Sequence, residues 1–236
     1  MKKIILFLLP IIACAQSTPQ QGTVYLTNSP TRVTVSAVPA VPIEHHLVDL
    51  TTLNPAPLLE IRYATEYNFT GEQLYPFPRA WLHEKAAKAL QEVQIDLAQQ
   101  GLGLKVYDGY RPLSVQRKMW NLIHDARYVS NPDVSRGRHT RGTAVDVTLV
   151  DKVGNELPMP TGFDDFTARA HRNYSDLTPK QKKDSKLLEA VMKKHGFDSF
   201  PFEWWHFDFH DWQNYPPLDI SFQDLTDGKR MTMPVP

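Results

Sequence analysis

The stretch SRGRHTRGTAVDVTL at residues 135–149 is the part of the chain that decides the fold. Apolar side chains alternate with small or polar ones over residues 143–150, which is the period of a β-strand. The apolar face of this strand would hold Val145, Val147 and Leu149. Asp146 lies on the other face, whereas His139, an odd number of residues earlier, would point away from it in a continuous strand. We therefore expect His139 to lie in the glycine-containing loop before the strand.

A second informative stretch is FEWWHFDF at residues 202–209, whose aromatic residues and period-two pattern favour another strand. Glu203 and His206 are also an odd offset apart, so a regular strand would direct their side chains to opposite faces. A turn or bulge at Trp204-Trp205 would let both side chains face one site. The spacing alone leaves this geometry open.

Together the two stretches supply two imidazoles and two carboxylates. Two imidazoles and one carboxylate can hold a zinc ion with one position open for water, and the other carboxylate can act as the base which that water needs. Either spacing alone, H-x6-D or E-x2-H, is a weak signal. The two spacings together, each in a strand-like context, indicate the site of a hydrolase.

The remaining periodic segments predict helices and one more strand. Apolar residues at three- and four-residue intervals in the stretch 81–104 predict a core-packed helix that Gly101 ends. Leu104 and Val106 then alternate in a short strand that breaks at Asp108-Gly109, with Arg111 at its end. Two further helices are expected at Ser114–His124 and Lys186–His195, the second one capped by Gly196.

Composition places the chain among ordinary globular proteins. A length of 236 residues with 42% hydrophobic residues is enough for one large domain. The 26 basic and 26 acidic residues cancel, so the overall charge gives no reason to expect nucleic acid or an anionic membrane as a partner.

The first residues, MKKIILFLLPIIACAQS, have the pattern of a secretory signal, which we assign to residues 1–15. The apolar run from Ile4 to Ile12 is too short to span a bilayer, so we expect no transmembrane segment in the mature protein. Ala13-Cys14-Ala15 fits an A-x-A cleavage site, whereas Ile11-Ile12-Ala13-Cys14 resembles a bacterial lipobox that would place a lipid anchor on Cys14. Both alternatives remain open, and both predict export to the periplasm or cell envelope.

Residues 16–43 are rich in Thr, Ser, Val, Pro and Gln and have no helical period, so we expect a flexible spacer before a folded domain at 44–236. An additional edge strand within this segment is the alternative. Because Cys14 is the only cysteine, the mature fold has no intramolecular disulfide, and a catalytic thiol is excluded.

The sequence around these motifs resembles that of the zinc D-Ala-D-Ala dipeptidases of the VanX-like family (peptidase M15). This family lies within a wider group of D,D-peptidases that share a fold with the hedgehog signalling domain. The resemblance covers most of the chain from about Leu58 to Phe209, and the similar segments occur in the order found in the family. These segments are IRYATEYNFTG (61–71), LYPFPRAWL (74–82), GLGLKVYDGYRPLSVQ (101–116), MPTGFDDFTARAHR (159–172) and EWWHF (203–207).

The resemblance implies an α+β fold, with a small central antiparallel sheet and flanking helices, and one Zn2+ ion per chain. The implied zinc ligands are His139, Asp146 and His206, and Glu203 is the implied general base and acid. Such an ion lowers the pKa of a bound water from about 15.7 to near 7, which makes the assignment chemically reasonable. Glu203 would take the water proton and return it to the departing amine.

The resemblance also implies that Arg111 stabilises the transition state and that Tyr63 and Asp164 hold the amino end of the substrate. From the residues alone, a turn arginine paired with Asp108 is the preferred interpretation of Arg111. Asp164 and its neighbour Asp165 could instead face solvent or cap a helix in the stretch FTARAH, residues 166–171.

Two positions depart from the family pattern. Gly137 stands where related enzymes often have a serine, and the absence of that hydroxyl could weaken substrate binding or widen specificity. Asp184-Ser185-Lys186 stands where an Asn-Arg pair is common, and we expect this change to affect helix packing only.

The expected function is zinc-dependent hydrolysis of the small D,D-dipeptide D-alanyl-D-alanine to two D-alanine molecules, in cell-wall peptide metabolism. One alternative is a D,D- or L,D-carboxypeptidase that acts on longer peptidoglycan stem peptides with the same metal site. Another is a zinc-stabilised binding module without catalysis, against which the presence of Glu203 and Arg111 argues, since a structural zinc site needs neither residue.

Overall fold

The computed structural model describes residues 46–227. The predicted signal at 1–15, the spacer at 16–43, the start of the domain at 44 and the possible anchor on Cys14 lie outside the described residues and stay predictions. Within residues 46–227, no helix is both long and apolar enough to cross a membrane.

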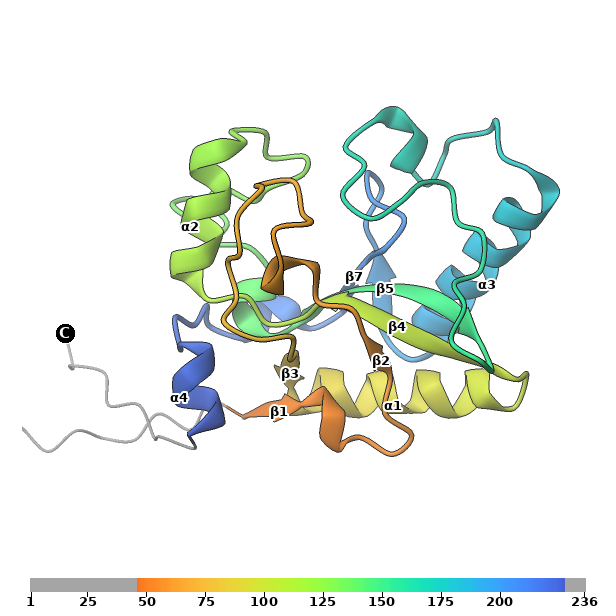
Figure 1. The fold of residues 1–236 in the computed structure, drawn as a ribbon, viewed down its shortest axis with the longest axis horizontal. Coiled ribbons are helices and arrows are strands. Elements are labelled where there is room, and N and C mark those ends of the chain that lie inside the picture. Colours follow the sequence, from red (N-terminus) through yellow and green to blue (C-terminus); the bar gives the residue numbers. More distant parts are fainter. Residues whose placement is uncertain (1–45, 228–236) are drawn as a thin grey trace, which may run out of the picture. The chain divides into compact units, whose positions relative to one another are not determined.

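The fold is α+β, as expected, and is built on one central sheet (Figure 1). Its strands, in spatial order, are β2 (Leu58–Leu59), β4 (Leu102–Asp108), β5 (Ala144–Asp151), β7 (His206–Phe209) and β6 (Phe197–Ser199). All neighbours pair antiparallel except the short β2, which runs parallel to β4. The expectation of a small antiparallel sheet therefore holds for all but this edge. A separate two-stranded sheet pairs β1 (Leu47–Asp49) with β3 (Trp81–His83).

The central strand β5 is buried on both faces over nearly its whole length. Its apolar side chains Val145, Val147 and Leu149 are fully buried in the core, as the alternating pattern predicts. The opposite face, which sequence patterns usually assign to solvent, is covered as well, because loops pack over it. Asp146 is consequently only 3% exposed and requires polar or ionic partners there.

The register of the sheet brings three polar side chains into one row. Asp146 on β5 lies directly across from His206 on β7 and from Asp108 on β4. An irregularity between Val106 and Asp108 shifts the register by one residue, since the preceding pairs would place Asp108 opposite Val145. Residues paired directly across antiparallel strands point to the same face, so the row forms on one side of the sheet.

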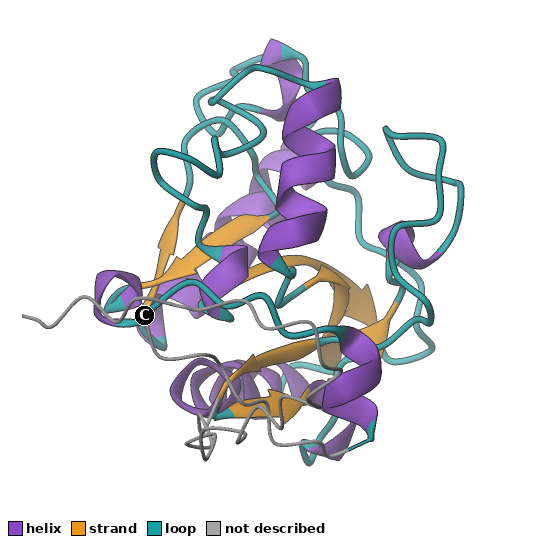
Figure 2. Cartoon of the chain, turned by 90° about the vertical axis from the view of Figure 1, so that its left-hand side faces the viewer, coloured by secondary structure: helices purple, strands orange, loops and turns teal. Residues whose placement is uncertain are grey.

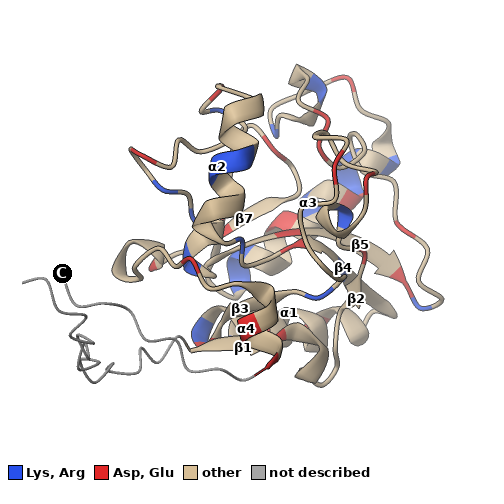
Figure 3. Ribbon diagram, turned by 60° about the vertical axis from the view of Figure 1, so that its left-hand side comes forward, with Lys and Arg blue, Asp and Glu red and all other residues tan. Residues whose placement is uncertain are grey.

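The main helices are α1 (Glu84–Ala98), α2 (Leu113–Leu122) and α3 (Pro179–Lys194), and a short α4 spans Phe222–Thr226. In Figure 1, α1 runs along one side of the sheet, and α2 and the long loops lie on the other. Figure 2 shows that loops predominate on that second side. Acidic and basic residues are interspersed along the ribbon (Figure 3).

Two helix starts differ from the sequence prediction. Residues 81–83 belong to the first predicted helix but form strand β3, because their backbone pairs with β1. Helix α1 therefore begins only at Glu84. Helix α3 begins at Pro179, before the predicted Lys186, because Thr178 and Gln181 form a reciprocal capping box. Gly196 follows α3 with φ 85°, in agreement with the predicted glycine cap. Asp184 lies inside this helix, where it is buried and accepts from Lys180 at 2.9 Å.

Candidate active site

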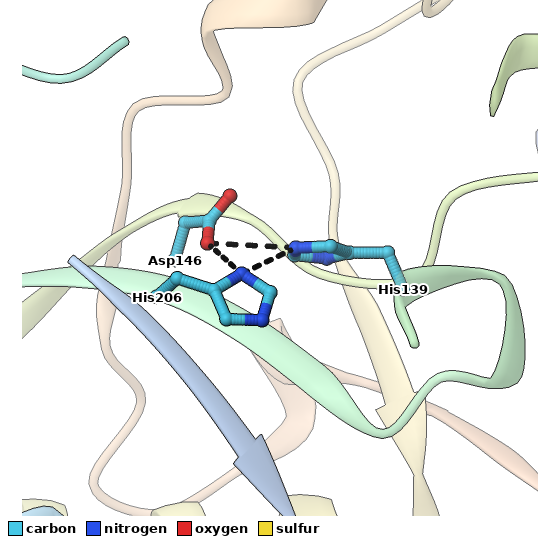
Figure 4. A group of neighbouring side chains, drawn as sticks. All are labelled: His139, Asp146 and His206. Atoms are coloured by element: carbon cyan, nitrogen blue, oxygen red, sulfur yellow. Dashed lines mark hydrogen bonds and ion pairs between the residues drawn. The ribbon is translucent and has the colours of Figure 1, made fainter. Parts of the chain in front are cut away.

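The three predicted metal ligands come together from different elements (Figure 4). Asp146 projects from β5, and His206 is the first residue of β7, directly across from it. His139 opens a 3-10 turn, His139–Arg141, before β5, as expected for a loop residue. Gly142 ends this turn with φ 66°, and a side chain at that position would collide with Leu47.

The inner atoms of these residues form a compact triangle. Nε2 of His139 lies 3.1 Å from Nδ1 of His206 and 3.4 Å from Oδ1 of Asp146, and the remaining side of the triangle is 3.0 Å. Ligand atoms at the corners of a tetrahedral zinc site are about 3.3 Å apart, given bond lengths near 2.0–2.1 Å. The observed separations therefore fit three corners of such a site.

The outer ring nitrogens explain why the inner atoms can bind a cation. Nδ1 of His139 donates to the carbonyl oxygen of Gly109 at 2.7 Å, and Nε2 of His206 donates to Oδ1 of Asp208 at 2.8 Å. In the neutral rings, this directs both remaining lone pairs at one point, beside the carboxylate of Asp146. Three acceptors that converge in this way repel one another unless a proton or a metal ion lies among them.

The pKa of His206 reflects the same crowding. Burial lowers this pKa, but the carboxylates of Asp208 and Asp146 outweigh burial and raise it to about 10. The pKa of Asp146 is lowered, because attraction to His139 and His206 exceeds the effect of burial. Because a histidine binds a metal ion only through a deprotonated nitrogen, metal binding at this site is linked to proton release.

Glu203 approaches the same point from the segment before β7. The chain bends at Trp204-Trp205, so β7 begins only at His206, as the odd offset required. Trp205 still accepts a backbone hydrogen bond from Val147 at 3.0 Å, which ties the bend to β5. Oε2 of Glu203 lies 3.8 Å from Nδ1 of His206, and burial raises the pKa of Glu203 to about 8. A carboxyl group with such a pKa can both take and return a proton near neutral pH.

Arg111 forms the ion pair with Asp108 that the sequence offered as one alternative, and it also lies in the cavity of the candidate site. Its Nε and Nη2 donate to Oδ2 of the fully buried Asp108 at 3.0 and 2.7 Å, and its Nη1 donates to Gln116 at 2.9 Å. The same guanidinium lies 5.3 Å from the ring centroid of Tyr63 and lines the cavity that contains the three candidate metal ligands. The ion pair therefore holds Arg111 in place at the site.

Tyr63 and Asp164 meet in this cavity although they are far apart in the chain. The hydroxyl of Tyr63 donates to Oδ1 of Asp164 at 3.1 Å, while the buried Oδ2 has no hydrogen-bond partner among the described residues. Burial, followed by the nearby carboxylate of Asp146, raises the pKa of Asp164 to about 8. Asp165, not Asp164, makes the local turn bond, by accepting from Thr167 at 3.0 Å. The solvent-facing and helix-capping alternatives are therefore wrong for Asp164.

Several residues that hold the candidate site residues in position were not identified from the sequence. Asp208 holds His206, Gln116 joins Arg111 to the carbonyl oxygen of Ser130, and the Gly109 carbonyl holds His139. Of these residues, only Asp208 could have been found from the sequence, since a residue two positions after His206 on a strand points to the same face. Gln116 and Gly109 are far in the sequence from Ser130 and His139, so no local pattern indicated these contacts.

Gly137 lies in the cavity wall with φ 76°. A Cβ there would make ordinary contacts of 3.6 Å with Gln116 and Ser130, so space does not exclude a side chain. The left-handed backbone does disfavour serine at this position.

The chain is similar to known proteins over its described part. The sequence profile of the peptidase M15 family, described as D-Ala-D-Ala dipeptidase, matches residues 43–224. A D-alanyl-D-alanine dipeptidase of Escherichia coli is 39% identical over 177 residues, which cover 75% of this chain and 91% of that protein. A D-alanyl-D-alanine dipeptidase of Enterococcus faecalis is 31% identical over 183 residues, covering 69% and 90% of the two chains.

Proposed function

Because the chain belongs to the peptidase M15 family of D-Ala-D-Ala dipeptidases, we propose that it is a metallopeptidase that hydrolyses D-alanyl-D-alanine to two D-alanine molecules, with zinc as the metal. The observation that carries this proposal is the convergence of His139, Asp146 and His206 beside the carboxyl group of Glu203. Structural zinc sites are usually closed by four protein ligands, whereas catalytic sites use three and leave the fourth position to a water, beside which a carboxylate can act as base.

The proposed metal ligands are His139, Asp146 and His206, and the metal is one Zn2+ ion per chain. Zinc held there supplies Lewis acidity and lowers the pKa of water to near neutrality. The second contacts of the two histidines, to Gly109 and Asp208, hold both rings in the tautomer that presents a lone pair to the ion.

Glu203 transfers the protons in this mechanism. Its carboxylate takes a proton from the attacking water and then gives that proton to the amine of the departing D-alanine. Burial raises its pKa to about 8, which keeps the two protonation states close in free energy at neutral pH. The distance of 3.8 Å between Oε2 of Glu203 and Nδ1 of His206, which follows the bend at Trp204-Trp205, supports this role.

Arg111 stabilises the negative charge that develops on the carbonyl oxygen during attack. Asp108 and Gln116 hold its guanidinium in position before the substrate arrives, so little reorganisation is needed. Loss of such a donor costs typically ~3 to 4 kcal/mol of barrier.

Asp164 and Tyr63 receive the cationic amine of the dipeptide. Oδ2 of Asp164 is buried without a hydrogen-bond partner in the described part of the chain, so a substrate ammonium group would supply the missing donor. The same ammonium would favour the charged carboxylate, whose pKa burial otherwise raises to about 8.

The cellular assignments are part of the same proposal. The amino-terminal pattern at residues 1–15 supports export to the periplasm or envelope, with cleavage after Ala15 or lipidation of Cys14. The mass of the mature amino terminus distinguishes the two, because lipidation adds acyl chains to Cys14 whereas ordinary cleavage leaves Gln16 free.

The function is tested with zinc-loaded protein and a panel of peptides. We expect turnover of D-Ala-D-Ala, much slower turnover of the L,L isomer and of a stem peptide ending in D-Ala-D-Ala, and about one zinc per chain. Glu203→Gln should retain zinc and lose about two to four decades in kcat. Glu92→Gln, an exposed change on α1, is the matched control and should behave as wild type. Preference for the stem peptide would instead assign the carboxypeptidase activity.

A further inference from the structure

The cavity that contains the metal ligands is lined by three arginines, Arg111, Arg127 and Arg138. Asp108 and Gln116 accept from all three nitrogens of Arg111 and use three of its five N–H donors, and the proposed mechanism assigns this arginine to the reacting carbonyl oxygen. Arg127 is paired with Asp125 through Nε and Nη2. Arg138 differs, because within residues 46–227 its only ionic contact is Nε, 3.1 Å from Oδ2 of Asp208. Its two terminal nitrogens make no hydrogen bond to any described residue.

Arg138 is nevertheless held in a defined place. Its guanidinium carbon lies 5.4 Å from the ring centroid of Phe200 and 4.8 Å from that of Trp212, and its side chain is 30% exposed. Asp208 bonds His206 through its other oxygen. The ring contacts and this ion pair position a planar donor edge beside the metal ligands while its terminal nitrogens stay available.

The same cavity contains a second unsatisfied group, of opposite charge. Oδ2 of Asp164 is a buried acceptor without a donor in the described part of the chain. Arg138 and Asp164 do not form an ion pair with each other, since no contact within 4.0 Å joins them in that part. One cavity therefore offers a separate acceptor for a cation and a separate donor for an anion, together with a metal site. A free dipeptide carries this pair of charges, an ammonium group at one end and a carboxylate at the other.

We propose that Arg138 binds the carboxylate of the substrate's carboxy-terminal residue and so selects peptides that end at this residue. This inference rests on the proposed dipeptidase function and adds the group that recognises the second end of the substrate. A guanidinium fork matches a carboxylate with two parallel hydrogen bonds, which a peptide amide cannot accept in the same way. The ordinary role of an aromatic-packed arginine would place no demand on the substrate.

The proposal is tested by comparing D-Ala-D-Ala with its carboxy-terminal amide. Wild-type protein should prefer the free acid. In Arg138→Gln, kcat/KM for the acid should fall roughly ten- to hundredfold, mainly because KM rises. The kcat/KM of the same variant for the amide should stay within about twofold of the wild-type value. Arg138→Lys should retain part of the preference. Arg127→Gln, which changes a paired arginine of the same cavity, should preserve it. An equal loss on both peptides, or no loss on either, would overturn the proposal.

Two further measurements separate this role from a structural one. Zinc content should remain about one per chain in Arg138→Gln, because a loss of metal would show that Arg138 acts through Asp208 on His206. Calorimetric binding of the acid and the amide to zinc-loaded Glu203→Gln, with and without Arg138→Gln, gives the same comparison without turnover. Wild-type protein that hydrolysed neither peptide would refute the proposed function, and the binding comparison would still decide the role of Arg138.

Discussion

Replacement of Asp108 by asparagine tests the buried ion pair that holds Arg111. Asp108 is fully buried, and its Oδ1 accepts from the Tyr75 hydroxyl at 2.8 Å and from the Gly109 amide at 2.9 Å. In Asp108→Asn, the side-chain oxygen would keep these two donors, and the amide nitrogen would face the guanidinium. Two donors would then oppose each other at the position where Oδ2 now accepts twice from Arg111.

The expected loss is about 3–5 kcal/mol of unfolding free energy, the usual result of removing one partner from a buried ion pair. At a fixed, saturating zinc concentration, the urea midpoint followed by tryptophan fluorescence should fall by roughly 1–3 M. Asp125→Asn is the matched control, because it removes the charge from an exposed aspartate–arginine pair and should produce no measurable shift. An Asp108→Asn protein within about 0.5 kcal/mol of wild type would refute the reasoning.

A double variant separates loss of the pair from a general change in packing. Asp108→Asn with Arg111→Met removes both charges, so the unpaired guanidinium that destabilises the single variant is absent. We expect the double variant to unfold at a higher urea concentration than Asp108→Asn alone. Its turnover should nevertheless be about two to three decades below that of wild type, since Arg111 is the proposed stabiliser of the transition state. Additive losses of stability would contradict the assigned coupling.

Further predictions concern the metal site and one helix end. Because the pKa of His206 is raised to about 10, zinc must displace a proton at any pH below that value, so zinc affinity should fall as the pH is lowered from 9 to 6 in a chelator competition. A flat profile would contradict this assignment. Gly109→Ala would place a Cβ 2.7 Å from the Trp81 carbonyl oxygen and displace the carbonyl that holds His139, so zinc affinity should fall about 10- to 100-fold. The control is Gly162→Ala, whose Cβ would meet nothing within 4 Å, and equal affinities would disprove the effect. Thr178→Ala removes the capping box of α3 and should cost about 1 kcal/mol of unfolding free energy in a denaturant titration, with zinc content unchanged.

The sequence predicted the structure best where an element depends on a pattern among neighbouring residues. The alternation over residues 143–150 predicted strand β5, and the odd offsets correctly removed His139 and Glu203 from regular strands. Errors occurred at helix starts. Residues 81–83 have helical spacing, but their backbone pairs with β1, whose strand lies more than thirty residues earlier in the chain. Strand pairing between residues so far apart does not change the spacing of apolar residues within either segment, so the sequence pattern could not reveal it.

By itself, the sequence determined the residue types able to hold a metal and the elements on which most of them lie, because hydrophobic period and turn chemistry act over a few neighbouring residues. The α+β class was implied by the resemblance of several ordered segments to a known family. Only the tertiary structure decided that these residues converge. The register of β4, β5 and β7 aligns Asp108, Asp146 and His206, and the irregularity after Val106 is needed for that alignment. Which strands pair, and in which register, depends on hydrogen bonds and burial between residues far apart in the chain. The arrangement of charges around the metal site, including the available fork of Arg138, follows from that long-range packing.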